Sequence, residues 1–201
     1  MSSSDNSNVQ TIIKNGDVIL VIGPEQVKIQ LSSSFLCLVS PVFSAMLNTP
    51  MSQGQMLKER GDKPVEYSLP EDSAEAASHT FQVLYGSDPK MPHLDPDEIF
   101  EVAKFVDKWD MVERFHFAST YWTTLYRESP SVAVERDDCW KLLVASYWFR
   151  NAISFSKLSY WMIVTEGYSL CEYINEMEDR QLGLELAREW HLLLATFQDA
   201  S

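Results

Sequence analysis

The sequence predicts an α+β protein in which a small sheet is combined with many short helices. Residues 18–22 are all apolar, and residues 27–31 alternate between apolar and polar side chains. A Gly-Pro turn separates the two runs, and this is the pattern of a strand pair. After Leu31 the apolar residues recur at helical spacing, and most of the remaining chain keeps that period. With 201 residues, 45% of them hydrophobic, the chain is long enough to bury a core.

The strand pair leads into two short helices that meet at a corner. Residues 18–22 are uninterrupted β-branched residues or Leu, which predicts a buried strand, and the alternation over 27–31 predicts a half-buried one. Ser40 is expected to cap the second helix, because Pro41 then occupies the first helical position and sacrifices only an amide hydrogen that would be unpaired. The side chains expected in the core at this corner are Leu36, Val42 and Phe43.

The next segment predicts a loop, a strand and two helices. Residues 48–63 contain Pro and Gly among polar residues and indicate a loop, and the alternation over 65–69 indicates a third strand. Both helices begin with the spacing of a capping box, at Asp72–Glu75 and at Asp95–Glu98, and Gly86 ends the first of them. The side chains expected on their buried faces are Ala77, Phe81, Leu84, Tyr85, Ile99, Val102, Ala103 and Val106.

Helices also account for the remainder of the chain. We expect them at about 112–126, from about residue 137, at about 155–164 and at 180–197. Short apolar helices gain most of their stability from docking, so those after residue 128 should pack on the preceding domain. The side chains expected in their contacts are Trp140, Leu143, Val144, Tyr147, Trp148, Leu182, Leu186, Leu193 and Phe197.

The chain's first residues and its composition exclude several classes of function. Residues 1–14 are rich in Ser and Asn and are expected to form a disordered tail, with some edge structure from Val9, Ile12 and Ile13. The net charge of −13 leaves no basic face, so nucleic acid and anionic membrane are poor partners. No signal peptide or membrane-spanning run is seen, which predicts a soluble protein.

The three cysteines are widely spaced and lie in apolar sequence. Without a C-x-x-C pair they favour buried thiols in a reduced, intracellular compartment, cytoplasmic or nuclear, over metal ligands or nucleophiles. These cysteines are Cys37, Cys139 and Cys171.

The search for catalytic motifs finds no phosphate loop, no G-x-S-x-G and no H-E-x-x-H. The carboxylates of 95–98 fit helix capping better than acid–base work, and the acidic stretch from Glu172 to Asp179 fits a solvated helix end better than a cation site. Aromatic residues at 147–149 and 160–161 fit core packing better than a binding groove. We therefore expect no enzyme, cofactor or metal. The four histidines, interpreted as surface or hydrogen-bonded residues rather than ligands, are His79, His93, His116 and His191.

The segment from Asp17 to Leu47 resembles the opening of a BTB/POZ domain. In that family a strand pair led by an Asp runs into two short helices, and their joint has a sequence similar to Ser40-Pro41-Val42-Phe43. Residues 83–86 and 102–109 also match the later helices of the family. The resemblance implies a BTB/POZ domain over residues 15–128 with a protein-interaction function. Residues 139–151 resemble the helical extension of fungal BTB-domain proteins, which implies such an extension over 129–201.

The sequence departs from the family pattern at three places. Ser32-Ser33 stands where the family has His and a basic residue, so Asp17 lacks that basic partner and binding of a corepressor through a charged pocket is not expected. Only sixteen residues precede Asp17, too few for the N-terminal dimerisation element of the family. Met51-Ser52-Gln53 stands where cullin-binding members have an apolar residue, any residue and Glu, and the uncharged amide predicts weak cullin binding.

Taken together, the residues and the resemblance predict an adaptor that binds a protein partner. The exposed helices and the 48–63 loop are the expected contact surface, with Met51, Ser52 and Gln53 as candidate partner-binding residues. Two alternatives stay open. One is a substrate adaptor of a cullin ubiquitin ligase, although the sequence supplies no separate substrate-binding domain. The other is a homo-oligomer, a self-assembling structural or regulatory protein.

Overall fold

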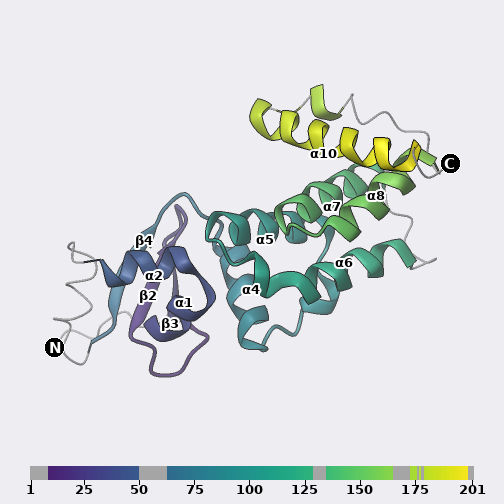
Figure 1. Cartoon of the computed structure of the whole chain (residues 1–201). Coiled ribbons are helices and arrows are strands. Elements are labelled where there is room, and N and C mark those ends of the chain that lie inside the picture. Colours follow the sequence, from purple (N-terminus) through teal and green to yellow (C-terminus); the bar gives the residue numbers. More distant parts are fainter. Residues whose placement is uncertain are drawn as a thin grey trace. The chain divides into compact units, whose positions relative to one another are not determined.

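The computed structural model is α+β, as predicted, with a four-stranded mixed sheet and short helices (Figure 1). It divides into two compact units, which are described one at a time. Unit 1 comprises Met1–Leu94 and Glu101–Arg114, and unit 2 comprises Asp95–Phe100 and Phe115–Ser201. The residues that the structure describes are 9–49, 63–128, 135–164, 173–175, 177 and 179–198.

The sheet of unit 1 has the strand order β1-β3-β2-β4. Strands β2 (Val18–Ile22) and β3 (Val27–Leu31) form the predicted antiparallel pair, and β4 (Val65–Leu69) is the predicted third strand, parallel to β2. In the central register Leu20 lies opposite both Ile29 and Tyr67, and all three are buried. The predicted strands are therefore confirmed.

An additional edge strand, β1 (Val9–Thr11), pairs in parallel with β3. The edge structure suggested by Val9 is thus present, and the prediction that residues 1–14 form a disordered tail is wrong for 9–14. Residues 1–8 lie outside the described ranges. Gly16 is required nearby, because a Cβ at this position would lie 2.1 Å from the carbonyl oxygen of Leu31.

Helices α1 (Ser33–Val39) and α2 (Pro41–Asn48) meet at the predicted corner. The Ser40 hydroxyl is buried, accepts from the Phe43 amide at 3.0 Å and donates to the Trp109 carbonyl at 2.6 Å. The predicted cap is confirmed, and Pro41 follows it at the first helical position. The same hydroxyl fixes the corner to the segment after α5.

The core prediction for this corner is confirmed for two side chains and wrong for the third. Leu36 and Phe43 are fully buried, whereas Val42 is 39% exposed. The buried face of α2 runs through Phe43 and Leu47, which are four residues apart, and Val42 lies at the edge of that face. The ring of Phe43 stacks on Trp109 with centroids 4.1 Å apart.

Helix α4 (Ala74–Tyr85) begins one residue later than its predicted cap. Ser73, not Asp72, is the N-cap, and its hydroxyl accepts from the Ala76 amide at 3.2 Å. Asp72 accepts from Lys108 Nζ at 2.8 Å instead, so the predicted box at Asp72–Glu75 is wrong. Gly86 ends the helix with φ of 76°, as predicted. Ala77 and Phe81 are buried, but Leu84 is half-buried and Tyr85 is 52% exposed, contrary to prediction.

The capping box predicted for α5 (Pro96–Lys108) is confirmed. Asp95 Oδ1 accepts from the Glu98 amide at 2.8 Å, and Glu98 Oε2 accepts from the Asp95 amide at 2.9 Å. The amides of Asp95 and Glu98 thus each have a side-chain acceptor. Two short 3-10 helices, η1 (Met91–His93) and η2 (Val112–Phe115), flank α5. The predicted stripe is buried at Ile99, Val102, Ala103 and Val106.

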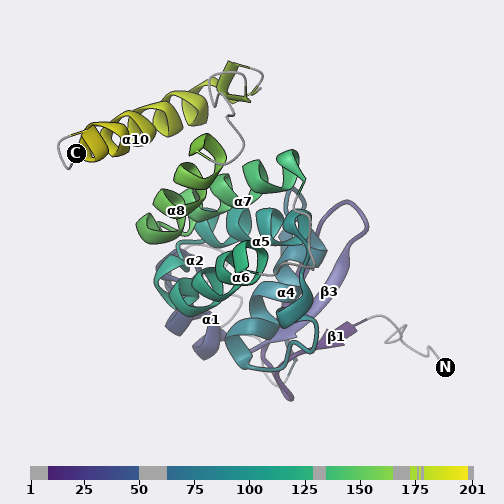
Figure 2. The same ribbon diagram turned by 90° about the vertical axis from the view of Figure 1, so that its right-hand side faces the viewer.

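Unit 2 contains helices α6 (His116–Glu128), α7 (Arg136–Trp148), α8 (Ala152–Val164) and α10 (Arg180–Gln198) (Figure 2). The predicted helices are present, with α8 beginning three residues earlier than expected. No helix of the described ranges has both the length and the apolarity needed to cross a membrane. The docking of residues 129–201 on the preceding domain stays a prediction.

A buried amide joins two of these helices. Asn151 Nδ2 donates to Ser119 Oγ and Thr120 Oγ1 on α6, both at 3.0 Å, while its Oδ1 accepts from the Ser154 amide at 3.1 Å and so caps α8. Figures 1 and 2 both show α6 and α8 beside one another.

The side chains predicted to pack in unit 2 have mixed outcomes. Leu143, Val144 and Leu186 are buried as predicted. The side chains of Leu193 and Phe197 lie outside the described set, as does Cys171. Cys139 is buried as predicted, but Cys37 in unit 1 is half-buried. The predicted core residues that are half-buried are Trp140, Tyr147, Trp148 and Leu182.

Candidate functional site

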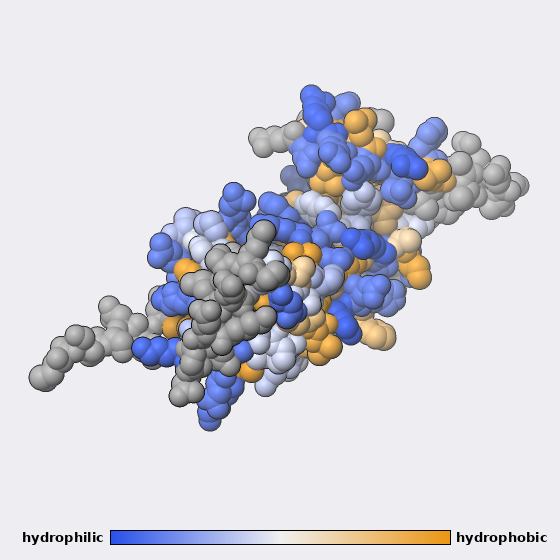
Figure 3. All heavy atoms as spheres, turned by 60° about the vertical axis from the view of Figure 1, so that its left-hand side comes forward, coloured by the Kyte–Doolittle hydropathy of each residue, from blue (hydrophilic) through white to orange (hydrophobic). Residues whose placement is uncertain are grey.

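The first candidate surface is the corner formed by α1 and α2, residues 33–48, here termed the helical corner. Leu38 is 68% and Val42 39% exposed, and Pro41 and Ala45 are also exposed. Soluble proteins rarely expose contiguous apolar surface without a function for it. Figure 3 shows apolar (orange) residues reaching the surface among hydrophilic (blue) and neutral (white) ones on the face turned toward the viewer.

The helical corner also lacks charge. No Asp, Glu, Lys, Arg or His occurs between Lys28 and Lys58, although the chain contains 29 acidic and 16 basic residues. Partner surfaces are typically depleted of charge at their centre, because burying an ion costs its hydration. This uncharged run is a sequence signal for the corner. The spacing of apolar residues does not reveal it, because that spacing says nothing of charge.

The corner is held in place by hydrogen bonds at both ends of α1. Asp17 accepts from the Ser33 amide at 2.6 Å and from the Ser33 hydroxyl at 2.7 Å, where the helix N-terminus favours a negative charge. Ser32 caps the helix by accepting from the Phe35 amide at 3.1 Å. At the other end Arg114 Nη2 donates to the Leu38 carbonyl at 3.2 Å. Ser33, at a position where the resemblance leads one to expect a basic partner for Asp17, therefore supplies both of these hydrogen bonds itself.

The candidate residues Met51, Ser52 and Gln53 lie outside the described residues. Of the 48–63 loop the structure describes only Asn48, Thr49 and Lys63. The prediction that the 48–63 loop and the helical corner form one contact surface therefore stays a prediction.

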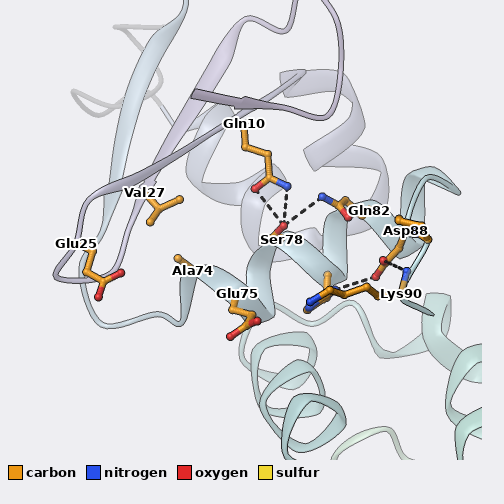
Figure 4. A pocket seen from close by; sticks show the side chains of 11 residues that line it. Gln10, Glu25, Val27, Ala74, Glu75, Ser78, Gln82, Asp88 and Lys90 are labelled. Carbon is orange, nitrogen blue, oxygen red and sulfur yellow. Dashed lines mark hydrogen bonds and ion pairs between the residues drawn. The ribbon is translucent and has the colours of Figure 1, made fainter. Parts of the chain in front are cut away.

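The second candidate is a cavity of about 440 Å³ in unit 1, here termed the α4 groove (Figure 4). Its wall combines polar and charged side chains from four separate segments of the sequence. Such a site is assembled by the fold, so no local motif could have revealed it. The lining residues are Gln10, Glu25, Val27, Ala74, Glu75, Ser78, His79, Gln82, Asp88, Pro89 and Lys90.

One wall of the groove is a buried pair. His79 Nδ1 lies 2.9 Å from Asp88 Oδ2, and the two side chains are 8% and 1% exposed. Asp88 Oδ1 also accepts from the Lys90 amide at 2.8 Å, which fixes the turn after α4. His79 is thus a hydrogen-bonded histidine, as expected from the sequence, and the other three histidines, His93, His116 and His191, are exposed.

Unit 2 has its own exposed apolar side chains. On α6, Phe117 is 88% and Tyr121 42% exposed, and on α8 Ile153 is 63% and Tyr160 52% exposed. The prediction that Tyr160 packs in the core is wrong, because the buried face of α8 runs through other positions, including Phe155, Leu158 and Met162. Among its described residues, unit 2 therefore exposes three large aromatic side chains and one large aliphatic side chain on α6 and α8.

One tyrosine of unit 2 has a strongly raised pKa. The Tyr173 hydroxyl donates to Asp137 Oδ1 at 2.9 Å, and its ring stacks on Trp140 with centroids 4.9 Å apart. Burial, followed by the hydrogen bond to Asp137 and the charge of that carboxylate, raises the pKa of Tyr173 to about 12. The Arg136 guanidinium lies 4.7 Å from the ring and opposes the shift. Tyr173 therefore stays neutral over the physiological range.

Of the acidic residues between 172 and 179, for which the sequence predicts a solvated helix end, the structure describes Asp179. Its Oδ1 accepts from the amides of Gln181 and Leu182, both at 3.0 Å, so Asp179 caps α10. Glu172, Glu176 and Glu178 lie outside the described residues.

Comparison with known proteins gives no relatives to guide the assignment: no family model matches the chain, and no curated protein matches it.

Proposed function

We propose that the chain is a non-enzymatic protein-interaction module of BTB/POZ type with a C-terminal helical extension, and that a protein partner binds the helical corner. The observation that carries the proposal is the exposure of Leu38 and Val42 on a segment that contains no charged residue. Residues 48–63, which follow α2 directly, would extend the contact.

The energetics favour an apolar partner. Complete burial of a Leu or Val side chain contributes about 1.5 to 3 kcal/mol. Even partial burial of both side chains would therefore supply a useful part of the binding free energy that corresponds to a micromolar dissociation constant. Because residues 33–48 contain no charged side chain, burying them carries a small desolvation cost for charge, limited to Arg114, which donates to the Leu38 carbonyl. The caps of α1 and α2 fix the exposed side chains in advance, which reduces the ordering cost.

The element order supports the BTB/POZ part of the proposal. A strand pair, two helices meeting at Ser40-Pro41, a third strand and then α4 and α5 follow one another as the resemblance implies. The carboxylate of Asp17 at the start of β2 reaches the beginning of α1, so the strand pair and the helix pair are joined at the residues that define the motif.

The test is affinity purification from native cells with a double variant, Leu38→Ser with Val42→Ser. Proteins captured by the wild-type chain should be lost with the variant, and its melting temperature should change little because both side chains are exposed. A matched control is Phe117→Ser, which removes an exposed apolar side chain from unit 2. Capture that is unaffected by the double variant, or equally reduced by the control, would contradict the proposal.

Light scattering on the same variants separates an adaptor from a self-assembling protein. An adaptor predicts a monomer mass that does not change with concentration. A mass that rises with concentration in the wild type and not in the double variant would identify a second copy of the chain as the partner.

A further inference from the structure

We infer that the α4 groove binds an extended peptide segment that carries a basic side chain and adds to the edge of the sheet at β1 (Figure 4). This inference is independent of the helical corner, because no lining residue of the groove belongs to α1 or α2. It concerns a second binding site on unit 1.

The first step concerns the main chain of β1. Within the described ranges, β1 is an outer strand of the sheet. The Ile12 amide donates to the Gln30 carbonyl of β3 at 3.2 Å, and successive amides of a strand point in opposite directions. The amides of Gln10 and Ile12 therefore face β3, and those of Val9 and Thr11 face away from it. An outer strand with outward amides is a template for an additional strand.

The second step concerns the size and floor of the groove. It follows α4 from Ala74 to Gln82, a rise of about 12 Å, which is the length of about four extended residues. Ser78 receives hydrogen bonds from Gln10 Nε2 at 2.8 Å and from Gln82 Nε2 at 3.3 Å, and Figure 4 shows these three side chains converging. The amides of Gln10 and Gln82 and the hydroxyl of Ser78 make the bottom of the groove polar. It therefore suits a bound peptide whose side chains facing α4 are small and polar.

The third step concerns charge. Three carboxylates, those of Glu25, Glu75 and Asp88, line the groove with Lys90 and His79. Asp88 is buried against His79, whereas Glu25 and Glu75 are exposed, and within the described parts of the chain neither glutamate has an ion-pair partner. The accessible carboxylates at the rim therefore favour a Lys or Arg side chain on the bound peptide.

The probe for the test is the fluorescein-labelled peptide Gly-Thr-Val-Lys-Val-Thr-amide, with fluorescence anisotropy as the measurement on the full chain. A peptide in which norleucine replaces Lys should bind about threefold more weakly, the size expected for an exposed ion pair. Glu75→Gln should remove this difference, and Glu25→Gln should reduce it. The matched control is Glu71→Gln, an exposed glutamate of the same unit that does not line the groove, and it should retain the full preference.

Strand addition is tested with two N-methylated versions of the peptide, each methylated on one edge only. Methyl groups on the edge that faces β1 should abolish binding, and those on the opposite edge should not. The inference is overturned if no saturable binding occurs, if both methylated peptides bind like the parent, or if the Lys preference survives Glu75→Gln and Glu25→Gln. The double variant of the helical corner should bind the peptide like the wild type, so this result does not depend on the function proposed above.

Discussion

Ser40 in unit 1 and Asn151 in unit 2 hold similar positions, since each lies between two consecutive helices and caps the second. Ser40 accepts from the amide three residues later, and Asn151 does the same for α8. Each also makes a contact far along the chain: Ser40 donates to the Trp109 carbonyl, 69 residues later, and Asn151 donates to Ser119 and Thr120, 32 and 31 residues earlier. The difference lies in the local signal: Pro41 follows Ser40 and marks the corner of unit 1 in the sequence, whereas Ala152 follows Asn151 and leaves the junction in unit 2 unmarked.

The largest expected effect tests the corner of unit 1. Phe43→Ala should lower the free energy of unfolding by about 3 to 5 kcal/mol, because it leaves a cavity beside Trp109 and Phe81. Urea denaturation of the purified variant measures the loss. The neighbouring Val42→Ala is the matched control, and its cost should stay within about 0.5 kcal/mol because Val42 is exposed. Equal costs for the two variants would contradict the assignment of the buried face.

The second effect tests the junction in unit 2. Asn151→Ala should cost about 2 kcal/mol, because it removes the cap of α8 and two buried hydrogen bonds to α6. Asn151→Ser should recover about 1 kcal/mol of this loss, since a Ser hydroxyl can cap the helix but cannot reach both hydroxyls of α6. If both variants cost the same in urea denaturation, the cap of α8 contributes nothing, and if Asn151→Ser costs nothing, the bridge to α6 contributes nothing.

Sequence patterns located most elements because their signals are local. The caps at Ser40 and Asp95 and the stop at Gly86 each act within four residues, and all three are observed where they were expected. Helix faces were harder to assign in short helices. The side chains of Val42 and Tyr85 follow the apolar period but lie at the edge of the buried face and are exposed.

The sites were predicted less well than the fold. Asp72 has the spacing of a cap, yet its carboxylate binds Lys108, which lies 36 residues away in the sequence. The α4 groove joins residues from position 10 to position 90, and the patterns around each of them carry no trace of the others. Such tertiary contacts override local preference, and only the folded chain reveals them.

A third, smaller effect compares two caps. Ser73→Ala at the start of α4 and Asp95→Ala at the start of α5 should each cost about 1 kcal/mol, because a cap satisfies amides of its own helix wherever that helix lies. Thermal denaturation of both variants measures the losses, with Glu71→Ala as an exposed control. A loss of several kcal/mol for either cap would show that its role extends beyond its own helix, as that of Asn151 does.

The smallest effect concerns the charge state of Tyr173 in unit 2. Its pKa is about 12 in the folded chain against an ordinary value of 10.0, so folding favours the neutral phenol. The associated stability is fully present below pH 10 and is lost as the pH rises toward 12. Asp137→Asn should lower the pKa of Tyr173 and leave it above its ordinary value, because burial is the larger cause of the shift. Ultraviolet absorbance of tyrosinate during an alkaline titration measures the change, and Tyr173→Phe identifies which transition belongs to this residue. A pKa that does not move in Asp137→Asn would show that the 2.9 Å hydrogen bond to the carboxylate is not maintained in solution.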